Sequence, residues 1–523
     1  MDEVDLLVVG GGINGVGIAR DAAGRGLRVL LAEKGDLGEG TSSRSGKYIH
    51  GGLRYLEYYE FRLVREALIE REVLLKAAPH IIWPMRMVIP HSPEQRPAWL
   101  VRLGLFLYDH LGGLGPLPGT RALDLRRDPE GRFIRKDFTK AFAYSDCWVD
   151  DARLVVLNAI DAAERGAAIL PRTEVVGARR EGPAWLVDLE SHGRRRTVRA
   201  KGLVNAAGPW VEQVLGRIDG VRSTRRVRLV KGSHIILPKF WDGPQAYVLQ
   251  HTDKRIIFVN PYEDDLALIG TTDIAFDGRP EDVAIDNGEI AYLFGIIERY
   301  FKVRLRREDL LHGYSGVRPL YDDDAANPSA VTRDYIFDID QGGGEVVTGR
   351  SAGGDSGSGT SDGTPPLLSV FGGKITTFRK LAEHALDKLQ PCFPAMGKAW
   401  TREAHLPGGD MADADAALHL EAVSRAHPWL PRRLARHYAR LYGTRIDRVL
   451  DGATGLAGLG RHFGGLFYEA EAHYLMQHEW AETADDILFR RTKHHLRLTA
   501  AEREGFALWL ETQAGGGQQR RTG

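Results

Sequence analysis

The first forty residues alternate between short apolar runs and segments of small residues. Residues 5–9 (DLLVV) are mostly apolar, and they are followed by glycines at positions 10, 12 and 15 and by small residues as far as 26. This order predicts a buried parallel strand that enters a helix through a glycine-rich turn. A second apolar run over 27–32 predicts the next strand, which ends at Glu33.

The glycine-rich turn has the spacing of a dinucleotide-binding site. Gly10 permits a tight turn, Gly12 lets a pyrophosphate approach the backbone, and Gly15 lets the helix pack closely on the strand. The phosphates then meet free N–H groups at the helix N-terminus. Glu33, about 20 residues further on, is placed to accept hydrogen bonds from ribose hydroxyls. An isolated G-x-G-x-x-G also occurs in other loops, but here strand, turn, helix, second strand and acid follow in the required order.

Later segments repeat parts of this pattern. An apolar strand that stops at small residues before a helix occurs again at 201–211 and at 367–381, which predicts further backbone contacts with the same cofactor. Residues 150–166 predict a helix that begins with an aspartate cap. The segment 40–56 interleaves small hydroxyl residues and paired glycines with His, Lys and Arg. We expect it to wrap the cofactor; a surface loop is the alternative.

The remaining pattern separates two further regions. Between 227 and 339 short β-type runs surround a single predicted helix at 286–300, which indicates an antiparallel sheet that carries the substrate. The glycine-rich segment 341–366 predicts a flexible loop. Beyond 407 apolar residues recur at helical spacing, and the polar face over 469–479 predicts ordinary solvated surface. The predicted helices are 412–424, 431–442, 465–480, 484–493 and 500–512.

One helix has the composition of a membrane-surface segment. Residues 96–111 are very apolar and carry Arg, Trp and Tyr near the ends, a pattern shared by interfacial and by buried helices. No run approaches the roughly 18 apolar residues of a spanning helix, so we expect no bilayer crossing. The acidic start also lacks the features of a signal peptide.

Composition narrows the functional classes. The 523 residues allow two or three domains, and equal totals of 70 basic and 70 acidic residues argue against a nucleic-acid partner. Basic clusters at 194–201, 222–231 and 490–495 are solvated faces or contacts with an anionic membrane. The two cysteines, Cys147 and Cys392, have no metal-ligand spacing, which suits a reducing compartment. We expect no metal.

The chain resembles the FAD-dependent, quinone-linked glycerol-3-phosphate dehydrogenases over its whole length. The motifs that carry the resemblance are GGGINGVGIARDAAGRGL, TSSRSGKYIHGGLRYLEYYEFRLVREALIEREVLL, YSDCWVDDARLV, LVNAAGPWV, LVKGSHII, IGTTD, YSGVRPL, TRDY, FGGKITTFRKLAEHAL and ETADDILFRRTK. Several of these are specific to that family rather than to flavoproteins in general.

The resemblance implies an α/β fold with three parts. A Rossmann-like FAD-binding domain of the D-amino-acid-oxidase/glutathione-reductase type is expected over 1–80, 150–230 and 367–395. An antiparallel β substrate domain of α+β type is expected over 231–340, the flexible loop over 341–366, and an all-α C-terminal domain over 401–523. Together, residues 1–400 form the oxidoreductase core.

The implied reaction is oxidation of sn-glycerol 3-phosphate to dihydroxyacetone phosphate, with hydride transfer to FAD and electrons passing to ubiquinone. The expected catalytic residues are His234 or His50 as base, with Arg318 and Lys374 stabilising developing charge. The expected substrate-binding residues are Arg54, Tyr55, Arg318, Arg333 and Lys374. The expected FAD contacts are Gly10, Gly12, Gly15, Glu33, Thr41, Ser42, Ser43, Gly51, Gly52, Leu53, Val175, Gly208, Gly373 and Lys374.

The resemblance also implies a peripheral protein on the cytoplasmic face of a bacterial inner membrane, and we expect a homodimer. Two features depart from the family. Gly46 stands where the family usually has Ser, and the insert at 341–366 is longer than usual. The alternatives to a quinone-linked dehydrogenase are an oxidase that reduces oxygen to hydrogen peroxide, and a non-catalytic flavoprotein that senses redox state. An amino-acid oxidase is disfavoured, because a carboxylate pocket does not need so many cations.

Overall fold

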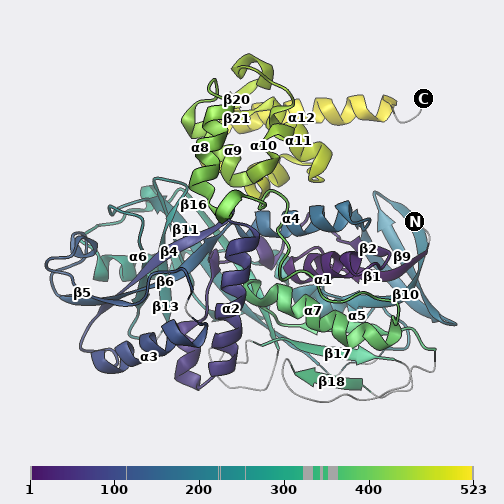
Figure 1. Cartoon of the computed structure of the whole chain (residues 1–523), viewed down its shortest axis with the longest axis horizontal. Helices are drawn as coiled ribbons and strands as arrows, with labels where there is room; N and C mark the ends of the chain where they lie inside the picture. Colours follow the sequence, from purple (N-terminus) through teal and green to yellow (C-terminus); the bar gives the residue numbers. More distant parts are fainter. Residues whose placement is uncertain are drawn as a thin grey trace.

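The computed structural model describes residues 3–520 apart from 114, 222, 224, 254, 322–333, 342–345 and 351–362. It contains two large β-sheets and a helical C-terminal domain (Figure 1). The C-terminal helices lie at one end of the molecule, and α3 (Ala98–Leu111) lies at the opposite end.

The first sheet is built around the opening strand. β1 (Glu3–Val9) pairs in parallel with β2 (Val29–Ala32) on one side and with β10 (Arg194–Asn205) on the other. The strand order is β18-β17-β19-β10-β1-β2-β7, and a hairpin of β8 and β9 extends from β10. The other strands are β7 (Ala168–Leu170), β8 (Glu174–Glu181), β9 (Ala184–Ser191), β17 (Ile336–Asp340), β18 (Val346–Arg350) and β19 (Leu367–Phe371).

Apolar layers cover both faces of this sheet, which explains the unbroken apolar run in β1. Leu6 and Val8 pack into one core together with α1 (Ile13–Gly24), α4 (Asp151–Glu164) and α7 (Phe378–Leu389). The alternating Leu7 and Val9 face the opposite core, which the β8–β9 hairpin and α5 (Val211–Leu215) complete. A strand buried on both faces needs apolar residues at every position.

The second sheet is mostly antiparallel and takes strands from two distant parts of the chain. Its order is β15-β11-β14-β13-β12-β4-β6-β3, with β16 paired to β11 and β5 paired to β6. Helix α6 (Asn287–Tyr300) packs against it and begins with the Asp286–Glu289 capping box. The strands are β3 (Tyr48–Ile49), β4 (Ile82–His91), β5 (Arg121–Asp124), β6 (Lys140–Val149), β11 (Val227–Pro238), β12 (Ala246–Gln250), β13 (Ile256–Tyr262), β14 (Leu266–Gly270), β15 (Ile274–Ala275) and β16 (His312–Tyr321).

The strand partners differ from the expected substrate domain at 231–340. β4, β5 and β6 from the first 150 residues belong to the second sheet, whereas β17 pairs with β19 in the first sheet. Hydrophobic alternation identifies a strand but does not specify its partner, and β4 meets β12 across more than 150 residues of sequence.

The prediction of a flexible loop over 341–366 is wrong for part of that segment. Residues 346–350 form β18, which pairs antiparallel with β17. The sequence of this strand, VVTGR, contains the β-branched run that favours strands. The surrounding glycines obscured this run, and the positions 342–345 and 351–362 lie outside the described residues.

The C-terminal domain is helical, as predicted. The predicted segment 484–493 forms η12 (Asp486–Arg491), which is a π-helix, and the start of the predicted segment 465–480 forms part of the short β20–β21 hairpin. The helix α10 was not predicted, since its five residues are too few to show a period. The elements are α8 (Ala416–Ala426), α9 (Arg432–Tyr442), α10 (Ile446–Leu450), β20 (His462–Gly464), β21 (Phe467–Tyr468), α11 (Glu469–His478) and α12 (Ala500–Arg520).

The basic cluster at 490–495 is not a solvated face. Arg491 is fully buried and donates to both carboxylate oxygens of Asp36, at 2.7 and 2.8 Å. Lys493 pairs with the buried Asp150, with Nζ 2.7 Å from Oδ1. The predicted solvated face at 469–479 is also partly wrong, because Glu479 is buried and pairs with Arg153 of α4.

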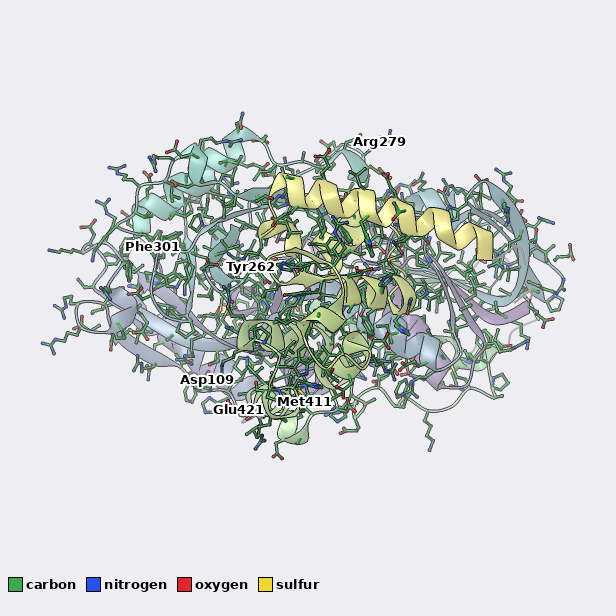
Figure 2. The ribbon with its side chains drawn as sticks, turned by 90° about the horizontal axis from the view of Figure 1, so that it is seen from above. Asp109, Tyr262, Arg279, Phe301, Met411 and Glu421 are labelled. Carbon is green, nitrogen blue, oxygen red and sulfur yellow. The ribbon has the colours of Figure 1, made fainter. Side chains whose placement is uncertain are left out.

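These ion pairs fix the C-terminal domain on the first sheet. The domain also contacts the second sheet, where Arg436 pairs with Asp264 at 2.9 Å. Figure 2, which is seen from above, shows the C-terminal helices lying over the middle of the molecule. The charged residues in this part of the sequence therefore hold domains together.

Candidate active site

The glycine turn brings the first strand, the helix and β10 into close contact. Gly10 has a φ of +108°, and a Cβ atom there would lie 2.7 Å from the carbonyl oxygen of Ala206. A Cβ atom at Gly15 would lie 1.9 Å from the carbonyl oxygen of Gly10. Only glycine fits either position, so the strand, the turn and the start of α1 pack closely against one another.

Two polar groups beside this turn provide further contacts for a dinucleotide. Glu33 accepts hydrogen bonds from the N–H groups of Gly11 (2.6 Å) and Gly35 (2.8 Å). Burial raises the pKa of Glu33, although both N–H groups oppose this effect. Asn14 donates to the carbonyl oxygen of Gly372 at 3.2 Å, while its buried Oδ1 has no partner among the described residues. Asn14 lines the cavity described below, so this oxygen is a candidate acceptor for a hydroxyl or N–H group of the coenzyme.

A cavity of about 1030 Å³ begins at the glycine turn and extends between the two sheets. The volume and the two-sheet lining suit a coenzyme together with a small substrate. The expected cofactor residues that line the cavity are Gly10, Gly12, Glu33, Thr41, Ser42, Gly52, Leu53, Val175, Gly208, Gly373 and Lys374.

Three of the expected cofactor residues do not line the cavity. Gly15 lies between the helix and the strand, as its packing role requires. The carbonyl oxygen of Ser43 accepts a hydrogen bond from Lys47 Nζ at 3.3 Å. The N–H of Gly51 donates to the Tyr108 hydroxyl at 2.8 Å. Ser43 and Gly51 thus shape the wrapping segment from behind the cavity surface.

Three of the four cations expected to bind phosphate are described, and all three lie in this same cavity. Arg54, Arg318 and Lys374 all line it, and Nζ of Lys374 lies 4.0 Å from the centroid of the Tyr55 ring. Arg54 makes no ion pair with the described residues, which leaves its guanidinium available to an anion. Arg333 lies outside the described residues.

Arg318 is held in place by two partners. Its guanidinium donates to Asp273 Oδ1 at 2.5 Å and to Thr271 Oγ1 at 3.1 Å. Its side chain is 35% exposed and lines the cavity, so it still has donors to offer a ligand. Asp273 positions the cation and offsets part of its charge.

The two candidate bases have different environments. His234 is buried against Gly270, and its ring stacks on Tyr314 with centroids 5.0 Å apart. Burial, together with the charges of Arg318 and Lys47, lowers the pKa of His234 to about 3. Its imidazole is therefore neutral at physiological pH and has a lone pair for a hydrogen bond, while its lowered pKa makes it a weaker base than an ordinary histidine. His50 also lines the cavity, and its N–H donates to Thr376 Oγ1 at 3.3 Å.

Sequence reasoning gave no role to some residues that shape the site. Asn14 is a polar residue in the first turns of α1, which are otherwise small and apolar as far as Ala19, and this contrast was the available signal. Lys47 is buried and pairs with Asp151, with Nζ 2.6 Å from Oδ1. The two residues of that pair are about a hundred positions apart, so no local sequence pattern predicts their contact.

One group outside the cavity has the composition of a metal site. His437, Glu471 and His494 place ligand atoms within 4.8 Å of one another. Each imidazole lies 2.9 Å from a carboxylate oxygen, and the Tyr442 hydroxyl donates to Glu471 at 2.7 Å. Burial opposes ionisation of Glu471, but the two histidines hold its pKa below the ordinary value. These hydrogen bonds satisfy the buried carboxylate without an ion.

Comparisons with known families agree with this site. The family described as FAD dependent oxidoreductase matches residues 5–355. The family described as C-terminal domain of alpha-glycerophosphate oxidase matches residues 399–504. The first match covers the strands of the two large sheets apart from β19, and the second covers the helical domain as far as the start of α12.

Two relatives match nearly the whole chain. A D-erythritol 1-phosphate dehydrogenase of Brucella abortus is 63% identical over 97% of both chains. A glycerol-3-phosphate dehydrogenase of Pseudomonas aeruginosa is 51% identical over 97% of this chain and 95% of the relative.

A solved structure has the same architecture. The glycerol-3-phosphate dehydrogenase of Bacillus halodurans complexed with FAD is 26% identical, with a TM-score of 0.71 over 98% of this chain and 94% of the other. The predicted fold class and the predicted cofactor are thereby confirmed. The chain belongs to the FAD-dependent oxidoreductase family, has FAD as its cofactor, and is similar to the glycerol-3-phosphate dehydrogenases within that family.

Proposed function

We propose that this protein oxidises the secondary alcohol of a polyol phosphate, and that glycerol 3-phosphate is its first candidate substrate. The observation that carries the proposal is the position of the buried His234 in the same cavity as Arg54, Arg318 and Lys374. A phosphate dianion needs such cations, and an alcohol that loses hydride needs a base.

FAD supplies the hydride acceptor in this chemistry. The C–H bond at C2 breaks and the hydrogen leaves as hydride, while the hydroxyl proton passes to the imidazole of His234. Arg318 and Lys374 stabilise the charge that develops on the oxygen. The product is dihydroxyacetone phosphate, and a quinone takes up the two electrons together with two protons.

The test is anaerobic addition of glycerol 3-phosphate to the FAD-loaded protein. The flavin absorbance should bleach within the mixing time of a stopped-flow instrument. A flavin that stays oxidised with every polyol phosphate would instead support a non-catalytic redox sensor.

D-erythritol 1-phosphate is a second candidate substrate. It is favoured by the 63% identity to a relative that carries its name, which exceeds the 51% identity to a glycerol-3-phosphate dehydrogenase. Both alcohols carry a phosphate and several hydroxyl groups, so the same cations and base serve either one. Comparing kcat/KM for the two alcohols decides between them.

We also propose a membrane quinone as the electron acceptor. The supporting observation is an exposed apolar patch made of Tyr59, Phe61, Trp99, Leu103 and Phe106. Three of these residues, Tyr59, Phe61 and Leu103, also line the cavity. A lipid-soluble quinone that enters from a membrane under this patch reaches the cavity directly.

The patch lies on α3, on the start of α2 (Phe61–Ala77) and on Tyr59, which precedes α2. None of the helices in the described ranges is long and apolar enough to cross a bilayer. We propose that α3 rests on the cytoplasmic face of the inner membrane. Cosedimentation with anionic vesicles tests this. Trp99→Ser with Phe106→Ser should release the protein, whereas Leu508→Ser on exposed α12 should not.

The acceptor is tested separately, by comparing rates with a quinone analogue and with oxygen as sole acceptor. Faster turnover with the quinone supports the proposal. Comparable turnover with oxygen, with stoichiometric hydrogen peroxide, would identify an oxidase instead.

A further inference from the structure

Gly46 lies beside the imidazole of His234 at a position where the backbone does not require glycine. Its φ is outside the left-handed region that favours glycine. A Cβ atom there would lie 3.5 Å from His234 Nε2 and 3.3 Å from two carbons of the Tyr48 ring. An added side chain would press on the Tyr48 ring and lie against the candidate base, so glycine keeps this part of the cavity open.

The residues that surround this space are fixed by contacts with one another and with Asn260. The Tyr48 hydroxyl donates to Asn260 Oδ1, and Asn260 Nδ2 donates to the carbonyl oxygen of Gly46 at 3.3 Å. The Tyr48 ring packs on Phe258 with centroids 4.7 Å apart. Gly46, Tyr48 and Phe258 all line the cavity. Because these contacts fix both the backbone and the rings, the walls do not close into the space.

The Arg318 guanidinium lies close to His234 although the two residues are four positions apart in the strand register. In the β11–β16 pair His234 faces Tyr314 and Arg318 faces Val230, but Nη2 of Arg318 reaches back over Gly232, where an added Cβ atom would lie 3.3 Å away. The Arg318 guanidinium is fixed toward Thr271 and Asp273. With the reacting hydroxyl at Nε2 of His234, the neighbouring carbons of the alcohol lie beside Gly46, because an added Cβ atom at Gly46 would be 3.5 Å from Nε2.

We propose that Gly46 determines which length of polyol phosphate is oxidised, and that the space beside His234 takes the additional carbon of a four-carbon substrate. The aromatic faces of Tyr48 and Phe258 suit the C–H surface of such a chain. A serine side chain at this position would fill the same space. This inference rests on the proposed oxidation of polyol phosphates and specifies its substrate class.

The experiment compares the FAD-loaded protein with Gly46→Ser and Gly46→Ala, using D-erythritol 1-phosphate and glycerol 3-phosphate. A difference of one carbon in a close-fitting pocket changes kcat/KM by about 10- to 200-fold. We expect the unmodified protein to use the four-carbon alcohol at least as well as glycerol 3-phosphate. The ratio to measure is kcat/KM for D-erythritol 1-phosphate divided by kcat/KM for glycerol 3-phosphate. Gly46→Ser should lower this ratio at least tenfold, and Gly46→Ala should lower it by a smaller factor.

The control is Gly295→Ser, whose added Cβ atom would meet nothing within 4 Å; the ratio should stay unchanged there. A ratio altered less than twofold in Gly46→Ser and Gly46→Ala overturns the role of Gly46 while leaving the proposed function intact. No flavin bleaching with either alcohol in the unmodified protein overturns both together.

A second readout needs neither turnover nor a variant. Calorimetry measures the dissociation constants of the two ketose phosphate products on the oxidised protein. The four-carbon product should bind at least as tightly as dihydroxyacetone phosphate. A four-carbon product that binds tenfold more weakly shows that the space is not used, even if the variants do not fold.

Discussion

Nζ of Lys374 lies 4.0 Å from the centroid of the Tyr55 ring, which joins the turn after β19 to the segment η2 (Leu53–Tyr58). The two residues are more than 300 positions apart in the sequence, yet both line the cavity. A cation over an aromatic face is attracted to the ring without losing its N–H donors. Tyr55 therefore positions the Lys374 amine while leaving it able to bind an anion.

Lys374→Gln should lower kcat/KM for the polyol phosphate by about two orders of magnitude, because it removes a charge-assisted hydrogen bond to phosphate or to the developing oxyanion. Steady-state kinetics with an artificial acceptor measures this. Lys380→Gln is the matched control, since Lys380 pairs with Glu383 on the next turn of α7. Equal losses in the two variants would mean that the site needs only net positive charge.

His234→Asn should reduce kcat by a factor of about 10² to 10⁴, the usual contribution of a positioned base. The FAD content, read from the absorbance ratio, should stay the same because His234 is not among the expected FAD contacts. His192→Asn serves as control, since His192 lies in a hairpin with a φ of +48°, which Asn tolerates well. A kcat within threefold of normal for His234→Asn would move the role of base to His50.

Gly15→Ala should yield protein with little or no bound FAD. The added methyl would overlap the carbonyl oxygen of Gly10, so the turn and α1 must move apart. The measurement is the flavin absorbance of the purified protein after reconstitution with excess FAD. Gly295→Ala should bind FAD normally, because its added methyl meets open space.

The FAD-binding part of this fold could be predicted from local sequence, because each of its signals lies within one short segment. Gly10, Gly12 and Gly15 act on their own turn, and Glu33 follows directly in the next strand. The strand partners of the second sheet could not be predicted, because β4 and β12 come from distant parts of the chain. Hydrophobic alternation specifies the faces of a strand but not its neighbours.

The candidate site shows the same limit. The cations and His234 could be named from residue type and family resemblance, but their partners could not. Asp273 beside Arg318 and Tyr48 beside Gly46 are brought into contact only by the folded sheet. The buried pairs of Arg491 and Lys493 were misjudged for a related reason, since a charge cluster is usually solvated and only tertiary contacts show otherwise.

Asp36→Asn should destabilise the protein by about 3–5 kcal/mol, the usual cost of leaving a buried charge without its partner. Asp36 accepts from Arg490 as well as from Arg491, and the side chains of Asp36 and Arg491 are fully buried. Denaturant unfolding gives the free energy, and limited proteolysis reports release of the C-terminal domain. Glu190→Gln, which breaks an exposed pair with Arg195, should change the free energy by less than about 1 kcal/mol. Similar effects of both variants would show that the buried pair does not hold the domain.

Acid should destabilise the folded protein through its buried histidines, beginning below pH 6.5. Burial, with Arg153, His419 and Arg440 nearby, lowers the pKa of His80 to about 3. Between pH 6.5 and pH 3 the unfolded chain therefore binds a proton at this position that the folded chain does not bind. Since the unfolded state holds more protons, stability falls as the pH falls.

His80→Gln removes this proton uptake, so the variant should lose less stability than the unmodified protein between pH 7 and pH 5. The difference expected at pH 5 is about 2 kcal/mol, from 1.36 kcal/mol per pKa unit. Denaturant unfolding at pH 7 and pH 5 measures the change in the free energy of unfolding for each protein. Each protein is compared with itself at pH 7, so any packing cost of the substitution cancels. Exposed His192→Gln should lose as much stability as the unmodified protein. If His80→Gln lost as much stability as the unmodified protein, His80 would take up its proton in the folded state as well. The structure around His80 would then have to open in acid.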